Sequence, residues 1–395
     1  MEVVEADETR QRRRRGGSDG HFKDDDGNLE CDDAGDGIAL LLLMLLQCGG
    51  LPGIAVGRCV VFNFGDSNSD TGSLPAAFGF YLGPPAGRRF FHRQTGRWSD
   101  GRLYIDFIAE KLKISYLSPY MESSGSDFTS GVNFAVAGAA VTQKSAIPLG
   151  LDTQVNQFLH FKNRTRELRP RGAGSMIAES EFRDAVYAID IGQNDITLAF
   201  LANLTLPEVE RELAASAAMV ADAVRALRAS GARKFWVYNT GPIGCLPQTL
   251  ALRQKPGDEL DAAGCLAEYN AAARSFNAEL AAACRRLAAE LGGGEDGATV
   301  VCTDMYAIKY ELFANHSRYG FERPLMACCG HGGPPYNYAN LKTCGQPTAT
   351  ACPEGERHVI WDGVHYTEDA NAIVARKILS GDFSSPRTKL KALCK

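Results

Sequence analysis

The sequence lacks several features that would point to other classes of protein. Its longest unbroken hydrophobic run, residues 38–46, has nine residues, whereas a membrane-spanning helix needs about 20. No lysine follows the glycine turn at Gly65 in the pattern of a phosphate-binding loop. Paired Cys-x-x-Cys units and internal repeats are also missing. These absences argue against a stable membrane span, a phosphate-binding loop, a common zinc module and a repeat protein.

Excess charge of one sign is scarce over most of the chain. The 395 residues carry a net charge of −5, and residues 1–36 alone hold 12 acidic and 6 basic side chains. Residues 58–395 hold 35 acidic and 36 basic side chains, so they lack a broad basic face for nucleic acid. An apolar content of 45% is sufficient for a large core. We therefore expect a folded protein with no nucleic-acid partner.

Residues 1–57 are predicted to be a leader. Residues 1–36 are polar and without hydrophobic period, which favours disorder. Residues 38–46 have the length of a signal-peptide hydrophobic region, and small residues after them suit cleavage after Gly50 or Gly57. The preceding segment is longer and more acidic than in most signal peptides, which a gene model started too far upstream would explain. A buried core helix is the alternative, but the flanking glycines disfavour it.

The cysteines favour export to an oxidising compartment. Ten of them lie in residues 58–395, and four cluster in a Gly/Pro-rich loop, namely Cys328, Cys329, Cys344 and Cys352. Such a loop is typical of disulfides, and we expect Cys245 to pair with Cys265. Zinc is the alternative for the cluster, but His331 is the only histidine close by and the usual ligand spacing is absent.

Three Asn-x-Ser/Thr triplets add to the case for a secreted, extracellular glycoprotein. The expected N-glycosylation sites are Asn163, Asn203 and Asn315. Each triplet is a weak signal by itself, because such triplets also arise by chance.

Residues 58–395 alternate between short apolar segments and helical patterns, and we expect them to form one domain. The predicted strands are residues 60–64, 185–191, 235–238 and 298–302. The predicted long helices are residues 207–230, between Pro207 and Gly231, and residues 258–291. A surface loop is expected at residues 83–96. This alternation predicts an α/β fold with a mostly parallel sheet covered by helices on both faces.

The segment GDSNSDTG, which begins at Gly65, follows the first predicted strand. Open α/β sheets bind ligands at the carboxyl ends of their strands, so Ser67 would be displayed there as a nucleophile. The Asp-x-Asn-x-Asp pattern that begins at Asp66 matches the start of a calcium-binding EF-hand loop. Its sixth and twelfth positions lack the required Gly and Glu, which excludes that site. Taken alone, the segment could equally be a polar turn without chemistry.

Near the C-terminus, the segment WDGVH places Asp362 three residues before His365. One local turn can point both side chains the same way, so that the carboxylate orients the imidazole. With Ser67 these residues supply a nucleophile, a base and an orienting acid. The Gly-x-Ser-x-Gly elbow of α/β-hydrolases is absent. The alternative is a solvated Asp and a packed His in a loop.

Together these blocks resemble the plant GDSL esterase/lipase family of the SGNH hydrolase superfamily, in particular its early-nodulin-like branch. The matching segments are FNFGDSNSDTG from Phe62, GRWSDGRLYIDFIAE from Gly96, YLSPY from Tyr116, GVNFAVAGAAV from Gly131, DIGQNDIT from Asp190, NTGPIGCLP from Asn239, CCG from Cys328, CG from Cys344 and WDGVHYTEDAN from Trp361. The resemblance implies a three-layer α/β/α sandwich and ester hydrolysis without cofactor or metal.

The resemblance also assigns roles to five residues. Ser67 corresponds to the nucleophile, and Asp362 and His365 correspond to the acid and base. Gly138 and Asn194 correspond to oxyanion-hole donors, which act together with the N–H of Ser67. Fixed N–H donors are the usual stabilisers of the charge that develops in ester cleavage. The glycine block reads VAGAA where the branch commonly has Thr-Ala-Gly-Ser-Thr, so all three of its hydroxyl positions are apolar here.

These residues predict a secreted serine esterase that forms an acyl-enzyme and acts on small-molecule or polysaccharide esters. Two alternatives remain open at this point. An acyltransferase would use the same triad with an alcohol in place of water. A catalytically weak carbohydrate-binding wall protein would retain the fold alone, although all five site residues are present.

Overall fold

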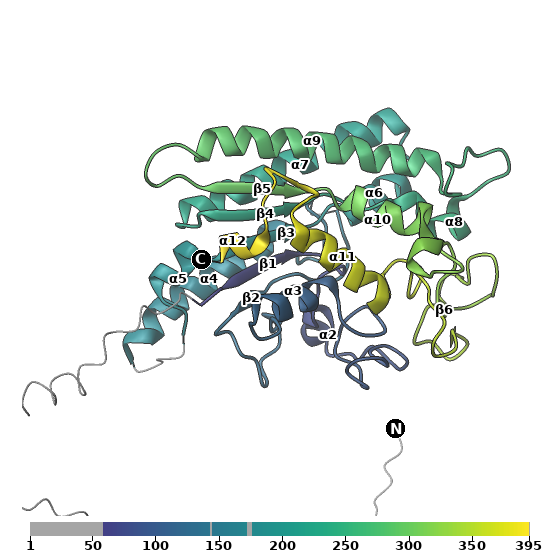
Figure 1. Cartoon of the computed structure of the whole chain (residues 1–395), viewed down its shortest axis with the longest axis horizontal. Helices are drawn as coiled ribbons and strands as arrows, with labels where there is room; N and C mark the ends of the chain where they lie inside the picture. The colour runs from purple at the N-terminus through teal and green to yellow at the C-terminus, as the bar shows by residue number, and fades with distance from the viewer. Residues whose placement is uncertain (1–57, 143, 172–175, 395) are drawn as a thin grey trace, which may run out of the picture. The chain divides into compact units, whose positions relative to one another are not determined.

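The computed structural model describes residues 58–142, 144–171 and 176–394, which belong to one compact unit (Figure 1). The predicted leader and signal peptide lie outside the described residues. None of the helices in these ranges combines the length and hydropathy that crossing a bilayer requires.

A six-stranded sheet forms the centre of the fold, in the order β2-β1-β3-β4-β5-β8. Its strands are β1 (Val61–Gly65), β2 (Gly131–Asn133), β3 (Val186–Asp190), β4 (Lys234–Tyr238), β5 (Thr299–Thr303) and β8 (Ser384–Ser385). All neighbouring strands are parallel except β8, which runs antiparallel to β5. A separate antiparallel pair joins β6 (Cys329–Gly330) to β7 (Thr350–Ala351).

Two groups of helices cover the sheet. One group contains α4 (Leu151–Leu168), α5 (Glu179–Asp184), α6 (Gln193–Leu201), α7 (Leu206–Ala229) and α9 (Ala267–Leu291). The other contains α3 (Tyr104–Leu112), α10 (Met305–Ala314), α11 (Glu368–Ser380) and α12 (Leu390–Leu393). Figure 1 shows α11 and α12 across the front of the strands. Short helices α2 (Ser73–Phe78) and α8 (Pro247–Arg253) flank the sheet. This arrangement is the expected three-layer α/β/α sandwich.

The strand that leads to Ser67 is fixed by an aromatic cluster. Every residue of β1 is buried. The Phe62 ring lies 5.0 Å from that of Phe158 on α4 and stacks at 5.4 Å on Phe182 of α5. Phe64 stacks on Phe134 at 5.2 Å. Such pairs contribute about 0.5–1.5 kcal/mol each beyond the area they bury, so β1 gives the loop after it a rigid base.

Most of the predicted elements agree with observed ones. All four predicted strands are present to within a few residues, and α7 matches the helix expected at residues 207–230. The prediction of a helix over residues 258–291 is wrong at its start, because α9 begins only at Ala267. Residues 258–266 instead form a loop in which Gly264 has φ +79° and Cys265 is tied to Cys245. The left-handed backbone of Gly264 is incompatible with a continuous helix there.

Ten cysteines of the described residues form five disulfides, and the predicted Cys245–Cys265 pair is confirmed. The loop cluster holds Cys328–Cys352 and Cys329–Cys344, so its sulfurs are not available as zinc ligands. The two remaining bonds are Cys284–Cys302, which ties α9 to β5, and Cys59–Cys394. Cys59–Cys394 joins the beginning of the described chain to its end.

Candidate active site

The parallel strands end together at one edge of the sheet. Register pairs Gly65 of β1 with Asp190 of β3, Asp190 with Tyr238 of β4, and Tyr238 with Thr303 of β5. The loop that carries Ser67 follows β1, and α6, which carries Asn194, begins three residues after β3. These two candidates therefore emerge at neighbouring strand ends, as ligand-binding residues do in open α/β sheets.

Ser67 lies in a tight turn. The Asp66 carbonyl accepts hydrogen bonds from the N–H groups of Ser69 (3.2 Å) and Asp70 (3.0 Å), while the Asp66 N–H donates to the Asp190 carbonyl (3.2 Å). Glycine is required at position 65, because a Cβ there would lie 2.3 Å from the Asp190 oxygen. The Ser67 side chain is thus presented from a backbone that is fixed on both sides.

Asp70 ties this turn to the glycine block. Its carboxylate accepts hydrogen bonds from the N–H groups of Gly72 (2.7 Å) and Leu74 (3.1 Å) at the start of α2. The same carboxylate accepts the N–H of Ala137 (2.8 Å), the residue before Gly138. Burial raises the pKa of Asp70, and these backbone donors oppose the shift. The acidic pattern that resembled a calcium loop therefore binds backbone N–H groups.

Gly138 and Asn194, far apart in sequence, are brought together. Asn194 Nδ2 donates to the carbonyl of Ala139 at 2.8 Å. Gly138 has φ +79°, and a side chain there would meet Ile147 at 2.8 Å. Within the described ranges, neither the Gly138 N–H nor the Ser67 N–H donates a hydrogen bond to another part of the chain. Both N–H groups are available to an external acceptor.

The glycine loop is held without the hydroxyls that the resembling branch carries. Val136 and Ala139 are fully buried, and the Val136 N–H donates to the Gly65 carbonyl at 3.1 Å. Beyond the glycine, Asp195 accepts the N–H groups of Val141 (2.9 Å) and Thr142 (3.1 Å). Backbone and carboxylate bonds therefore shape this loop together with the Ser145 hydroxyl, which donates to the Gly138 carbonyl at 2.7 Å.

Asp362 and His365 form the expected pair. Asp362 Oδ2 lies 2.7 Å from His365 Nδ1, and Oδ1 accepts the N–H groups of Val364 (3.0 Å) and His365 (2.9 Å). Burial raises the pKa of Asp362, but the charge of His365 and these hydrogen bonds outweigh it and hold the pKa below its usual value. Because Nδ1 faces the carboxylate, Nε2 is the ring nitrogen left for another partner.

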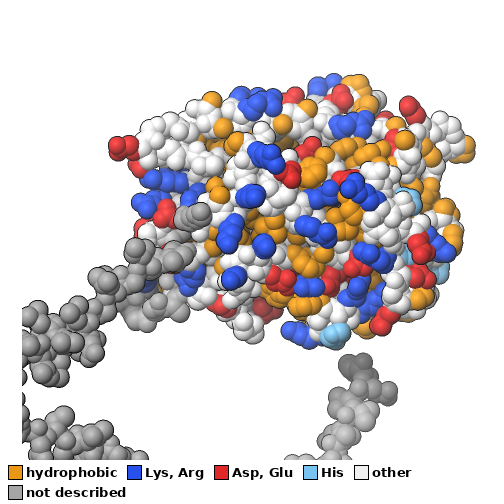
Figure 2. All heavy atoms as spheres, in the orientation of Figure 1, with side chains coloured by type: hydrophobic (Ala, Val, Ile, Leu, Met, Phe, Trp, Pro, Cys, Tyr) orange, Lys and Arg blue, Asp and Glu red, His pale blue; other side chains and the backbone are white. Residues whose placement is uncertain are grey.

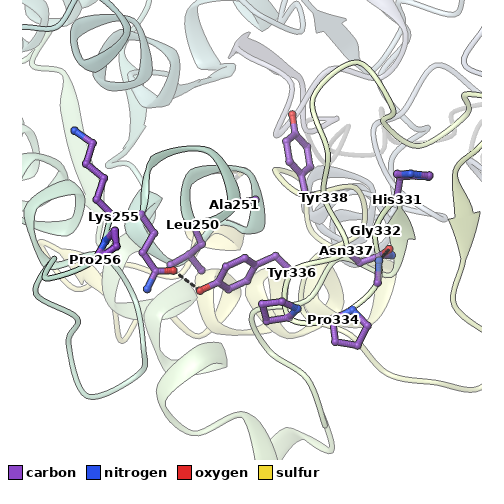
Figure 3. Close-up of a pocket in the computed structure, with 13 residues that line it drawn as sticks. Leu250, Ala251, Lys255, Pro256, His331, Gly332, Pro334, Tyr336, Asn337 and Tyr338 are labelled. Carbon is purple, nitrogen blue, oxygen red and sulfur yellow. Dashed lines mark hydrogen bonds between the residues drawn. The ribbon is translucent and has the colours of Figure 1, made fainter.

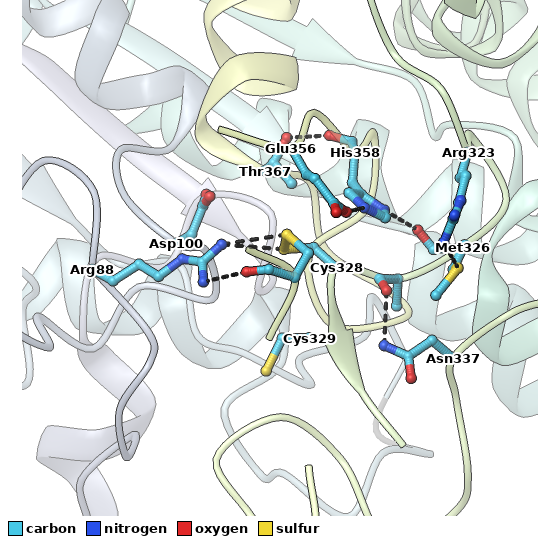
Figure 4. The surroundings of a disulfide bond; sticks show 12 residues. Arg88, Asp100, Arg323, Met326, Cys328, Cys329, Asn337, Glu356, His358 and Thr367 are labelled. Atoms are coloured by element: carbon cyan, nitrogen blue, oxygen red, sulfur yellow. Dashed lines mark hydrogen bonds and ion pairs between the residues drawn. A yellow bond between two sulfur atoms is a disulfide. The ribbon is translucent and has the colours of Figure 1, made fainter. Parts of the chain in front are cut away.

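The disulfide loop, residues 328–352, is joined to the Asp362 segment by backbone hydrogen bonds. The N–H groups of Cys328 and Cys329 donate to the carbonyls of Ile360 (2.9 Å) and Trp361 (2.6 Å). Arg88 donates to the Cys352 carbonyl at 2.8 Å, contacts the sulfurs of the Cys328–Cys352 bond (Figure 4) and lies 5.3 Å from the centre of the Trp361 ring. A cross-linked loop thus holds the backbone that leads to the acid and base.

A pocket of about 480 Å³ is lined by residues of the segments 250–256 and 331–338 (Figure 3). Tyr338 lines it and packs against Gly363, where a Cβ would lie 2.3 Å from the Tyr338 ring. Gln248 fixes this contact, because its Nε2 donates to the Tyr338 hydroxyl at 2.6 Å and its N–H donates to the Gly363 carbonyl at 3.0 Å. Tyr336 and Lys255 lie on other walls of the pocket.

Among the described residues, Ser67 Oγ forms no hydrogen bond to His365. Instead, both segments contact the buried Lys309: Asn68, which follows Ser67, and Tyr366, which follows His365. The sequence reasoning missed Lys309, Asp70 and Asp195. The only available signal for Lys309 was a lysine on the apolar face of the pattern in residues 305–314.

Comparisons with known proteins show the family of the chain. A family model described as GDSL-like lipase/acylhydrolase matches residues 61–378. A GDSL esterase/lipase of Arabidopsis thaliana is 51% identical over 339 residues, which cover 85% of this chain and 90% of that protein. An esterase of Hevea brasiliensis is 43% identical over 85% of this chain and 88% of its own length. The GDSL esterase/lipase ENOD8 of Medicago truncatula is 40% identical over 89% of this chain and 95% of its own length. The chain therefore belongs to the GDSL lipase/acylhydrolase family and is a carboxylic ester hydrolase.

Proposed function

We propose that this protein is a secreted serine esterase in which Ser67 is the nucleophile, His365 the general base and Asp362 the residue that orients the base. The observation that carries the proposal is the 2.7 Å contact between Asp362 Oδ2 and His365 Nδ1, on a segment that the disulfide loop supports. This contact fixes the imidazole so that Nε2 can accept the Ser67 proton.

In the proposed reaction, Ser67 Oγ attacks the ester carbonyl carbon while its proton passes to His365. The carbonyl oxygen becomes negatively charged and is bound by the N–H groups of Ser67 and Gly138 and by the Asn194 side-chain amide. Collapse of this intermediate expels the alcohol, which takes the proton from His365, and leaves an acyl-enzyme. Water activated by His365 then releases the carboxylic acid and regenerates Ser67.

Secretion and glycosylation form part of the proposal. Five disulfides suit an oxidising compartment. Asn163, Asn203 and Asn315, the expected glycosylation sites, are all exposed to solvent. Asn203 lies in a turn and Asn315 directly follows α10, whereas Asn163 lies within α4. The expected substrates are small-molecule or polysaccharide esters.

A fluorophosphonate probe tests the proposal. We expect the folded protein to be modified at Ser67 alone, and Ser67→Ala to lose both labelling and ester hydrolysis. Ser73→Ala is the matched control, because Ser73 begins the neighbouring helix α2 and its buried hydroxyl has no hydrogen-bond partner. Peptide mapping by mass spectrometry locates the label. Labelling at another residue, or none in folded protein, would remove Ser67 as the nucleophile.

A further inference from the structure

Three ionisable side chains that the proposed reaction does not use lie buried beneath the Ser67 turn. Asp66 precedes Ser67 and is 1% exposed, Asp190 ends β3, and Lys309 on α10 is 2% exposed. Asp66 and Asp190 are held together by the 3.2 Å bond from the Asp66 N–H to the Asp190 carbonyl, and Asp190 Oδ2 accepts the Tyr104 hydroxyl at 2.7 Å. Lys and Asp are seldom fully buried unless they are paired, so this cluster requires an explanation.

The Lys309 ammonium contacts the residue that follows the nucleophile and the residue that follows the base. Its Nζ donates to Asn68 Oδ1 at 3.1 Å and lies 4.7 Å from the centre of the Tyr366 ring. The stem reaches this position past Gly241, where a Cβ would lie 2.8 Å from Lys309 Cδ. The Lys309 side chain thus contacts two segments that are far apart in the sequence.

Asn68 extends the connection to the oxyanion-binding helix. Its Nδ2 donates to Asp66 Oδ1 at 2.9 Å and to Gln193 Oε1 at 3.3 Å, and Gln193 precedes Asn194 in α6. The Asn68 N–H also donates to Asp66 Oδ1 at 2.9 Å. All of the hydrogen-bonding groups that orient Asn68 are therefore supplied by Lys309, Asp66 and Gln193.

The charges of the cluster depend on one another. Burial and the charge of Asp190 raise the pKa of Asp66 to about 7, and Lys309 opposes this rise. Burial also raises the pKa of Asp190 and lowers that of Lys309, and in each case the opposite charges counteract the shift. Loss of the ammonium would therefore favour protonation of Asp66. Hydrogen bonds to a carboxylate are about twice as strong as those to a neutral oxygen, so Asn68 would be held less firmly.

We propose that Lys309 is a positioning residue, whose buried ammonium fixes Ser67 through Asn68 and the His365 segment through Tyr366. This inference rests on the proposed function, because it takes Ser67 and His365 as the reacting pair. The inference adds that the relative position of Ser67 and His365 depends on the Lys309 ammonium, which contacts neither residue.

The test compares variants by the rate of fluorophosphonate labelling at Ser67 and by kcat and KM for p-nitrophenyl acetate. Lys309→Met keeps most of the volume of the side chain and removes its charge. We expect kcat and the labelling rate to fall about 10²-fold, the size of effect that a misplacement of about 1 Å causes, with little change in KM. Lys162→Met is the matched control. Lys162 is also buried, but its ammonium contacts Ser230 and Glu179, next to the segments that lead into β4 and β3.

A second substitution separates the charge from its packing. Asp190→Asn removes one of the two negative charges while keeping an acceptor for Tyr104. In the Lys309→Met background it relieves the repulsion on Asp66, so we expect the double variant to recover about tenfold of the lost kcat. If Lys309 acted through packing alone, the loss of kcat in the double variant would be the product of the losses in the two single variants. Asn68→Leu keeps the three ionisable side chains but breaks the connection, and it too must lower the labelling rate, even if Lys309→Met does not fold.

The outcomes distinguish this inference from the proposed function. If wild-type protein is not labelled at Ser67, the proposed function fails. If wild-type protein is labelled and folded Lys309→Met is labelled equally fast, the proposed function stands and Lys309 has no positioning role. Multiplying losses in the double variant, wild-type kcat in Asn68→Leu, or an equal fall of kcat in Lys162→Met would also overturn the inference.

Discussion

Removing the side-chain amide of Asn194 separates a catalytic role from a structural one. In the free protein, Asn194 Nδ2 uses one of its two hydrogens in the 2.8 Å bond to the Ala139 carbonyl, which leaves the other for an oxyanion. Asn194→Ala removes both. Loss of one oxyanion donor costs about 10²–10³ in kcat, or roughly 3–4 kcal/mol of transition-state stabilisation. KM should change little, because the uncharged ester oxygen is bound weakly.

The structural part of the effect is smaller and has its own readout. Ala139 is fully buried, so leaving its carbonyl without a donor costs about 1–3 kcal/mol of unfolding free energy. We therefore expect both a lower melting temperature and a large fall in kcat of the folded fraction. Thr197→Ala is the matched control on the same helix, because its hydroxyl donates only to the Gln193 carbonyl, at 3.1 Å. A purified, folded Asn194→Ala protein with normal kcat would refute the donor role and leave a structural role alone.

Two further predictions concern the segment that carries the acid and base. Because the pKa of Asp362 lies below its unfolded value, its ionised form stabilises the fold above the unfolded pKa of about 3.9, and this stabilisation is lost as the pH falls through the folded pKa. The melting-temperature difference between wild type and Asp362→Asn should therefore be largest near neutral pH and shrink in acid; a difference independent of pH would contradict the assigned ionisation. Gly363→Ala places a side chain at φ +103° and 2.3 Å from the Tyr338 ring, so it should lower the unfolding free energy by more than about 1 kcal/mol and reduce kcat. Denaturant unfolding and ester hydrolysis measure the two effects, and an unchanged Gly363→Ala protein would show that this contact is not needed.

Local sequence patterns predicted those structural features that depend only on residues close together in the chain. The buried strands are continuous apolar runs, and an Asp three residues before a His can reach it within one turn, as Asp362 and His365 do. The short strands β2 and β8 escaped prediction because three and two residues carry no measurable period. They pair only because longer strands already stand beside them.

The supporting residues of the site could not be found in this way, because their partners are distant in the chain. Asp70 binds the N–H of Ala137, 67 residues away, and Lys309 binds Asn68, 241 residues away. An aspartate in a polar turn and a lysine in a helix are each ordinary locally. Their roles follow only from the alignment of strand ends, which brings the loops after β1, β2, β3 and β5 to one edge of the sheet.

The disulfide between Cys59 and Cys394 makes the body of the protein a covalent ring. The two Cα atoms are 4.8 Å apart and the bond spans 335 residues, so one proteolytic cut in any surface loop leaves a single cross-linked molecule. In the chain-entropy description, closing a ring of that size restricts the unfolded chain by about 6 kcal/mol. Because these two positions lie close together, a short peptide linker could join them in place of the disulfide. New termini could then be opened elsewhere, as in a circular permutant. Such a ring would keep the two fragments of a nicked chain covalently joined.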